Sequence, residues 1–302
     1  MTTVPAWPDT AREALRGTPV QTAWRSLVFR AGARRERQAL DGVRTYCLFL
    51  GHARSGHSVI GALLDAHRQI AISDEFDALR YLEAGFTRGQ LLYGSLEIAR
   101  RQAANLRRKQ GRGGTTYSYH VPDGWQGRAD DLRVVGDSRA GWTTRRLAAD
   151  PGLLDRLQQR MAPSELRFVH VVRNPYDNIA TMMLRGERSF ESAFGQYAAN
   201  CEAIGPLSER IGAERVLQVR HEALIADPRA TLAELCIFLG VEADEPYLAA
   251  ASAQVYRSPA RSRREIEWRP DDERRVDELI RRFAFLAGYG RDDEPEAAAA
   301  SG

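Results

Sequence analysis

The sequence predicts an α/β protein with a P-loop-type parallel sheet of about five strands, flanked by helices on both faces. Short apolar runs alternate with helical patterns, as in parallel sheets that are buried on both sides. A length of 302 residues, with 43% hydrophobic and 27% charged residues, suits one large globular domain. The stretch GHARSGHS at 51–58 has the G-x-x-x-x-G spacing of a phosphate-binding loop between a strand and a helix.

The expected elements follow one another in alternating order. Strands are expected at the apolar runs 44–51, 69–73, 132–137, 166–173 and 214–224. Helices are expected at 56–67, at 75–110 with breaks near Gly85 and Gly89, after Gly141, from Pro175, at 227–240 and at 270–290. Proline favours the first position of a helix, and Thr143 and Thr144 are cap candidates for the helix after Gly141.

Three parts of the chain differ in composition. Residues 1–42 form an Arg-rich N-terminal extension, with a basic helix that places Trp24, Leu27 and Val28 on one face. Residues 43–290 form the α/β domain, and the low-complexity tail 291–302 is expected to be disordered. The favoured interpretation of the basic helix is packing against its own domain. Contact with a membrane surface through residues 10–40, and a homodimer contact, are the alternatives.

Charge and cysteine content exclude several classes of protein. A net charge of +3 is too small to indicate nucleic-acid binding. Lys109 is the only lysine, so an anion site must use arginine, helix N-termini and hydroxyl groups. The three cysteines are widely spaced, which predicts buried reduced thiols, no metal or redox motif and a cytoplasmic location. We expect neither a signal peptide nor a membrane span.

The loop at 51–58 is the first candidate site. A glycine turn between a strand and a helix N-terminus directs backbone N–H groups at one anion, and Arg54 can reach the same anion. His57 stands where a nucleotide P-loop has the lysine that contacts the β- and γ-phosphates. An ATP-using enzyme needs that charge. The loop therefore suits a donor with a shorter 5′ arm, such as a 5′-phosphosulfate.

Strand, loop and helix together resemble the 5′-phosphosulfate loop of the sulfotransferases that use 3′-phosphoadenosine-5′-phosphosulfate (PAPS). In the carbohydrate and tyrosylprotein branches this loop commonly reads P-R-S-G-T-[TS]. Arg54, Ser55, Gly56 and Ser58 match it, whereas Ala53 replaces the proline and His57 replaces a threonine. The resemblance implies that residues 54–58 hold the 5′-phosphate, with His57 serving as a backbone donor.

A second motif resembles the 3′-phosphate element of the same family. FVHVVRNPYDNIAT at 168–181 is a strand ending in R-[DN]-P-x-[DE], and the resemblance assigns the 3′-phosphate to Arg173 and Thr181. SPARSRREIEW at 258–268 resembles a basic stretch that closes over this phosphate, with Ser258, Arg261 and Arg263 as candidates; a solvated loop is the alternative. Residues 220–241 match a family segment that we interpret as structural. The resemblance covers about residues 43–290.

The catalytic base is expected to be Glu75. LLDAHRQIAISDEF resembles the segment after the loop in the tyrosylprotein branch, and Glu75 falls on the acid that is the base there. A carboxylate near the donor can take the proton of the attacking hydroxyl. The alternative is that Asp74 or Glu75 caps the next helix. His120 is the competing base, because YSYHVPDGW resembles the K-T-H-L-P histidine of cytosolic sulfotransferases.

The end of the third strand, GDSRAG at 136–141, departs from the family. Relatives often have a lysine where this chain has Ser138, so Arg139 or Arg54 is expected to stabilise charge on the transferring group. Asp137 could instead bind Mg²⁺ in a nucleotide kinase.

The expected function is sulfuryl transfer from PAPS to a hydroxyl, without a metal. The alternatives are an ATP- and Mg²⁺-dependent P-loop kinase, a nucleotide-binding protein without turnover, and a membrane-surface protein that acts through its N-terminal helix. The acceptor class stays open: a small molecule, a sugar or a lipid head group. Residues 76–130 are expected to bind it through the aromatic residues Tyr81, Phe86, Tyr93, Tyr117, Tyr119 and Trp125.

Overall fold

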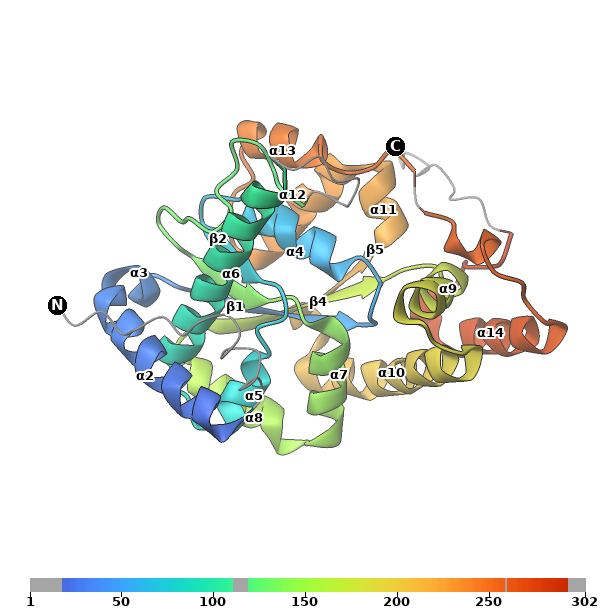
Figure 1. Cartoon of the computed structure of the whole chain (residues 1–302), viewed down its shortest axis with the longest axis horizontal. Helices are drawn as coiled ribbons and strands as arrows, with labels where there is room; N and C mark the ends of the chain where they lie inside the picture. The colour runs from blue at the N-terminus through green and yellow to red at the C-terminus, as the bar shows by residue number, and fades with distance from the viewer. Residues whose placement is uncertain (1–17, 111–118, 259, 293–302) are drawn as a thin grey trace.

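A computed structural model describes residues 18–110, 119–258 and 260–292 (Figure 1). The expectations for residues 1–17, for Tyr117 and for the tail from residue 293 therefore lie outside the described residues. The described chain forms a central sheet with helices on either side of it (Figure 1).

The sheet contains five strands in the described residues, in the order β2-β3-β1-β4-β5, and every neighbouring pair is parallel. The strands are β1 Thr45–Gly51, β2 Ile70–Ser73, β3 Val134–Asp137, β4 Glu165–Val172 and β5 Val216–Arg220. This confirms the predicted parallel sheet. The predicted fifth strand is too long, because the chain turns into helix α11 (His221–Ala226) directly after Arg220.

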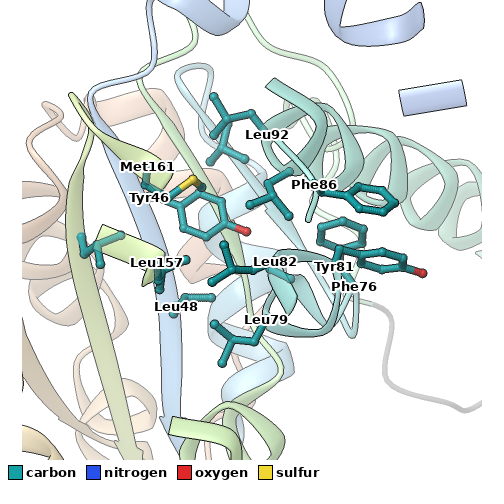
Figure 2. Close-up of a cluster of buried hydrophobic side chains, with 14 of the residues drawn as sticks. Tyr46, Leu48, Phe76, Leu79, Tyr81, Leu82, Phe86, Leu92, Leu157 and Met161 are labelled. Carbon is teal, nitrogen blue, oxygen red and sulfur yellow. The ribbon is translucent and has the colours of Figure 1, made fainter. Parts of the chain in front are cut away.

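Alternate residues of the central strand β1 face two different cores, as the period of two in a strand requires. Cys47 and Phe49 pack with α4 (His57–Asp65), α12 (Pro228–Leu239) and α13 (Glu245–Ser252). Tyr46 and Leu48 pack on the opposite face, with α5 (Ala78–Glu83), α6 (Arg88–Gln110) and α8 (Gly152–Met161) (Figure 2). Both faces of the sheet are therefore covered by helices.

The remaining helices extend these two layers. They are α2 Pro19–Arg35, α3 Arg37–Asp41, α7 Ala140–Ala149, α9 Pro175–Gly186, α10 Phe190–Ile211 and α14 Pro270–Arg282, with 3₁₀ turns at Ala213–Arg215, Ser262–Arg264 and Ala284–Leu286. A third apolar cluster joins α9, α10 and α14 around Tyr176 and Trp268. This cluster supports the end of β4, where Arg173 lies.

Several predicted boundaries differ from the structure. The predicted helix 75–110 is two helices, and the break lies between Glu83 and Arg88 while Gly89 continues α6. Helix α14 ends at Arg282, earlier than predicted. The predicted caps Thr143 and Thr144 lie inside α7, whose N-cap is Arg139. The sequence patterns did not predict α8, α10 and α13 as separate helices.

Helix α2 packs against α6 of its own domain, as the favoured interpretation expected. Its Phe29 ring contacts the rings of Phe76, Tyr81, Phe86 and Tyr93. The predicted apolar face is wrong in one respect, because Leu27 is 64% exposed. No helix in the described part of the chain has the length and apolar character to cross a membrane. Membrane-surface contact and a homodimer stay predictions.

The same aromatic cluster corrects an expectation about the acceptor. Tyr81, Phe86 and Tyr93 are buried core residues, each less than 5% exposed. Figure 2 shows Tyr81 and Phe86 among the other side chains of this core. They are therefore not available to line an acceptor site.

Candidate active site

The loop after β1 lies at the carboxyl edge of the sheet, where α/β proteins bind ligands. Gly51, the last residue of β1, is held by side chains of two helices: its N–H donates to Thr144 Oγ1 of α7 at 3.0 Å, and its carbonyl accepts from Asn200 Nδ2 of α10 at 2.9 Å. The Ala53 carbonyl accepts from Asn178 Nδ2 of α9 at 2.7 Å. Side chains of three helices, α7, α9 and α10, therefore hold the backbone of the loop.

The loop ends at the N-terminus of α4. The first-turn N–H groups of a helix have no intrahelical acceptor and attract anions. Gly56 is the N-cap, with a left-handed φ of 97°, and a Cβ there would lie 2.4 Å from Nδ1 of His221. Glycine is therefore required at this position by both conformation and space.

His221 is a site residue that the sequence analysis missed. It follows the end of β5, and the rule that ligands bind at strand ends could have identified it. Burial, together with the nearby charge of Arg173, lowers the pKa of His221 to about 3. The imidazole is therefore neutral at physiological pH, and its Nδ1 is buried without a partner in the described structure.

Arg173 and Thr181 form a second anion site beside the loop. The Arg173 guanidinium is 6% exposed and donates to Thr181 Oγ1 at 3.2 Å and to the Ala260 carbonyl at 2.8 Å. It also donates to the Arg54 carbonyl at 3.1 Å. Thr181 Oγ1 donates to Ser262 Oγ at 2.9 Å. Segment 260–262 thus closes onto Arg173.

One cavity of about 280 Å³ joins these groups. Its lining includes most of the residues that the sequence predicted, namely Arg54, Gly56, His57, Ser58, Glu75, Arg173 and Thr181. Tyr119, His221 and Ser262 also line it. The two predicted phosphate sites therefore share one space.

Glu75 is presented by a turn that the sheet holds in place. Glu75 and Asp77 both have a left-handed φ of 63°, and the Asp137 carboxylate accepts the N–H groups of Phe76 and Ala78, each at 3.0 Å. The exposed Glu75 carboxylate makes no hydrogen bond or ion pair with any described residue. It is free to accept a proton from a bound group.

The alternative roles of nearby acids do not fit this turn. Asp137 is buried, which raises its pKa to about 7, and both its oxygens are used by the backbone of the turn. Asp74 accepts from the hydroxyls of Ser58 and Ser138, at 3.1 and 3.0 Å. Helix α5 has Asp77 as its N-cap, so neither Asp74 nor Glu75 caps it. The described residues contain no group of three side chains arranged to hold a metal.

A sequence profile of the sulfotransferase family matches residues 48–245, more than half of the chain. The chain belongs to the sulfotransferase family. The match includes both anion sites and the turn that carries Glu75.

Solved sulfotransferase structures have a similar fold. The sulfotransferase domain from the Synechococcus PCC 7002 olefin synthase has a TM-score of 0.51 and 20% identity, covering 78% of this chain and 93% of that one. The sulfotransferase domain from the curacin biosynthetic pathway has a TM-score of 0.51 and 17% identity, covering 80% and 97%. At sequence identities of 20% and 17%, these matches show a shared fold. No curated protein gave a significant match to the sequence.

Some predicted residues of this sulfotransferase lie outside the cavity lining. His120 directs Nδ1 at Gln126 Oε1, 3.2 Å away, while its neighbour Tyr119 lines the cavity. The hydroxyl of Ser55 is buried and has no partner in the described structure. Arg139 pairs with Asp77 at 3.2 Å and lines an adjoining cavity.

The segment after Ala260 is not a solvated loop. Arg263 is buried and pairs with Asp177 of α9, at 2.5 Å from Nη1 to Oδ2, and its backbone N–H donates to Oδ1 at 2.9 Å. Arg261 and Arg263 do not line the cavity, whereas Ser262 between them does. Arg263 therefore holds the segment in place, and Ser262 is the group that it presents to the anion site.

Proposed function

We propose that the protein is a PAPS-dependent sulfotransferase that transfers a sulfuryl group to the hydroxyl of an acceptor. The observation that carries this proposal is the single cavity lined by both the 51–58 loop and the Arg173–Thr181 pair. A donor with phosphate-like groups at both the 3′ and the 5′ position of its ribose needs two anion sites separated by one ribose. Arginine suits the 3′-phosphate because its planar fork binds two phosphate oxygens.

We place the adenine base where the donor cavity meets a smaller apolar cavity of about 30 Å³. A second, less polar cavity adjoins the first and shares Val59, Tyr119, His221 and Ala260 with it. Its remaining lining is largely apolar and comes from Leu63, Leu224, Ile225, Gln254, Val255, Tyr256 and Ser258. A flat heterocycle at the junction of the two cavities contacts these apolar side chains, as small-molecule sites favour.

The reaction then proceeds by in-line attack. The acceptor oxygen forms a bond to sulfur, while the bond from sulfur to the bridging oxygen of the 5′-phosphate breaks. The Glu75 carboxylate takes the hydroxyl proton. The loop N–H groups and the Arg54 guanidinium stabilise the negative charge on the leaving phosphate. The products are a sulfate ester and adenosine 3′,5′-bisphosphate.

Two observations favour this donor over ATP. His57 replaces the lysine of a nucleotide P-loop, and the carboxylate of Asp137 is occupied by the turn that carries Glu75. The unpartnered Glu75 carboxylate favours an enzyme over a nucleotide-binding protein without turnover. The three buried cysteines are free thiols, which supports a reducing compartment such as the cytoplasm.

Calorimetry tests the donor assignment. We expect adenosine 3′,5′-bisphosphate to bind in the presence of a chelator, more tightly than ATP with Mg²⁺. Arg173→Ala should weaken the bisphosphate about 100-fold, because a buried charge-assisted contact is lost. Arg156→Gln is the control, since Arg156 forms an exposed ion pair with Asp150 and lines neither cavity. Tighter binding of ATP with Mg²⁺ would favour the kinase.

A further inference from the structure

Another cavity, of about 400 Å³, adjoins the donor cavity on the side of α7. The two cavities share Ala53, His57, Glu75 and Arg188. The cavity beside α7 is otherwise lined by Arg139, Ala140, Gly141, Trp142, Arg145 and Gln196. A molecule bound there can therefore reach the same Glu75 carboxylate that faces the donor.

Three guanidinium groups line this cavity beside α7, and two of them have no carboxylate partner among the described residues. Arg139 pairs with Asp77, and Arg146, which shares Asp77, also pairs with Glu83 at 2.6 Å, so these four charges balance. Arg188 donates to the uncharged amide oxygen of Gln196. Arg145 forms no ion pair with a described carboxylate, and its Nη1 is buried without a hydrogen-bond acceptor. Arg145 and Arg188 therefore outnumber the one unpaired carboxylate of the cavity, Glu75, and the cavity carries a net positive charge.

The arginines are also held close to one another. The exposed indole of Trp142 has the guanidinium of Arg145 4.6 Å from its ring centre and that of Arg139 at 5.2 Å. Burial lowers the pKa of Arg145, and the charges of Arg188 and Arg139 lower it further. Like charges gathered in a partly buried cavity repel one another, and a bound anion relieves that repulsion.

We propose that this cavity binds the acceptor, and that the acceptor carries an oxyanion group which Arg145 and Arg188 hold while its hydroxyl reaches Glu75. This inference rests on the proposed function, because it uses Glu75 as the base. The oxyanion is a carboxylate, sulfate or phosphate, all of which match the guanidinium fork. A neutral acceptor leaves the arginines uncompensated and binds less well.

Matched acceptor pairs test the inference. 4-Nitrophenyl β-D-glucuronide and 4-nitrophenyl β-D-glucoside differ in one carboxylate, as do 4-hydroxyphenylacetate and 4-hydroxyphenylacetamide. Binding is measured by calorimetry on the protein saturated with adenosine 3′,5′-bisphosphate, and turnover is measured with PAPS. We expect the anionic member of a pair to bind about tenfold more tightly than its neutral partner. This ratio of affinities should become smaller at high salt.

Arg145→Gln should abolish this preference and leave bisphosphate affinity within about twofold, because Arg145 does not line the donor cavity. Arg156→Gln should keep the preference. The inference is overturned if no anionic member is preferred, if the preference survives Arg145→Gln, or if that variant weakens the bisphosphate instead. If the wild type fails to bind the bisphosphate, the donor assignment is overturned as well. If it binds the bisphosphate but shows no preference for anionic acceptors, only this inference is overturned.

Discussion

The guanidinium of Arg173 donates a hydrogen bond to the backbone carbonyl of Arg54, 3.1 Å away. This contact joins the end of β4 to the loop after β1, because the two strands are neighbours and run parallel. The group proposed to bind the 3′-phosphate therefore also fixes the shape of the loop proposed to bind the 5′-phosphate. We therefore expect binding at one end of the proposed donor to depend on the geometry at the other end.

Arg173→Lys tests this double role. Lysine keeps the charge but loses the fork that contacts Arg54, Thr181 and Ala260 together. We expect affinity for adenosine 3′,5′-bisphosphate to fall about tenfold or more, and affinity for adenosine 5′-monophosphate to fall as well, because the loop is less well ordered. Calorimetry with both nucleotides measures this. An unchanged affinity for the monophosphate would mean that Arg173 acts on the 3′-phosphate alone.

Glu75→Gln separates chemistry from binding. The amide cannot take the proton of the acceptor, so we expect kcat to fall by about 10²- to 10⁴-fold while bisphosphate affinity changes by less than about twofold. Turnover is followed with PAPS and calorimetry measures binding. His120→Ala is the matched comparison and should retain activity, since His120 lies against Gln126 and outside the cavity lining. An active Glu75→Gln together with an inactive His120→Ala would reverse the assignment of the base.

The sheet and the loop could be predicted because their signals are local. Buried parallel strands are continuous apolar runs, and all five expected strands are present near their predicted positions. The loop after β1 follows from glycine spacing within eight residues. The helix boundaries were less accurate, because α5 and α6 are separated by a short turn within one continuous helical pattern.

The positioning contacts could not be predicted, because each joins residues far apart in the sequence. Asp137 reaches the turn of Glu75 only because β3 pairs with β2, and His221 meets Gly56 only because β5 and β1 flank β4. A basic stretch such as 258–268 gives no sign that Arg263 is buried against Asp177. These roles depend on side-chain packing between distant parts of the chain, which a single sequence does not reveal.

Gly56→Ala should damage both the loop and the fold. A residue other than glycine at a φ of 97° is strained, and the added Cβ would lie 2.4 Å from His221 Nδ1. We expect a loss of about 2 kcal/mol or more in the free energy of unfolding, and a loss of bisphosphate binding. Chemical denaturation and calorimetry measure the two effects.

Adding His221→Ala to that variant should recover part of the stability, because it removes the clash but not the strain. Gly195→Ala is the control. Gly195 lies on α10 with no atom within 4 Å of an added Cβ, so alanine there should be neutral or stabilising by up to about 1 kcal/mol. A Gly56→Ala variant as stable as Gly195→Ala would contradict the packing described for the loop.

Buried histidines should make the protein sensitive to acid. Burial lowers the pKa of His170 to about 4, from 6.5 in the unfolded chain. Below pH 6.5 the unfolded state binds a proton that the folded state excludes, so stability is present above pH 6.5 and is lost as the pH falls toward 4. This group alone contributes a loss of about 3 kcal/mol across that window.

His170→Leu removes the titrating group from that window. The difference in unfolding free energy between wild type and variant should therefore move in favour of the variant by up to about 3 kcal/mol between pH 6.5 and 4. Denaturant unfolding at several pH values measures it. A difference that stays constant over this range would show that the folded state can protonate His170.

Asp177→Asn breaks the buried pair that holds segment 260–263 against α9. It leaves the guanidinium of Arg263 buried without its partner, so we expect a loss of about 3–5 kcal/mol in unfolding free energy. Bisphosphate affinity should fall too, because Ser262 and the Ala260 carbonyl are then less well fixed beside Thr181 and Arg173.

Glu245→Gln is the control: its pair with Arg229 is exposed, and its removal should cost about 0–1 kcal/mol. The double variant Asp177→Leu/Arg263→Met should recover stability relative to Asp177→Asn, since apolar residues of similar size often replace a buried pair without loss. If Asp177→Asn were no less stable than Glu245→Gln, the pair would not be what fastens this segment over the donor.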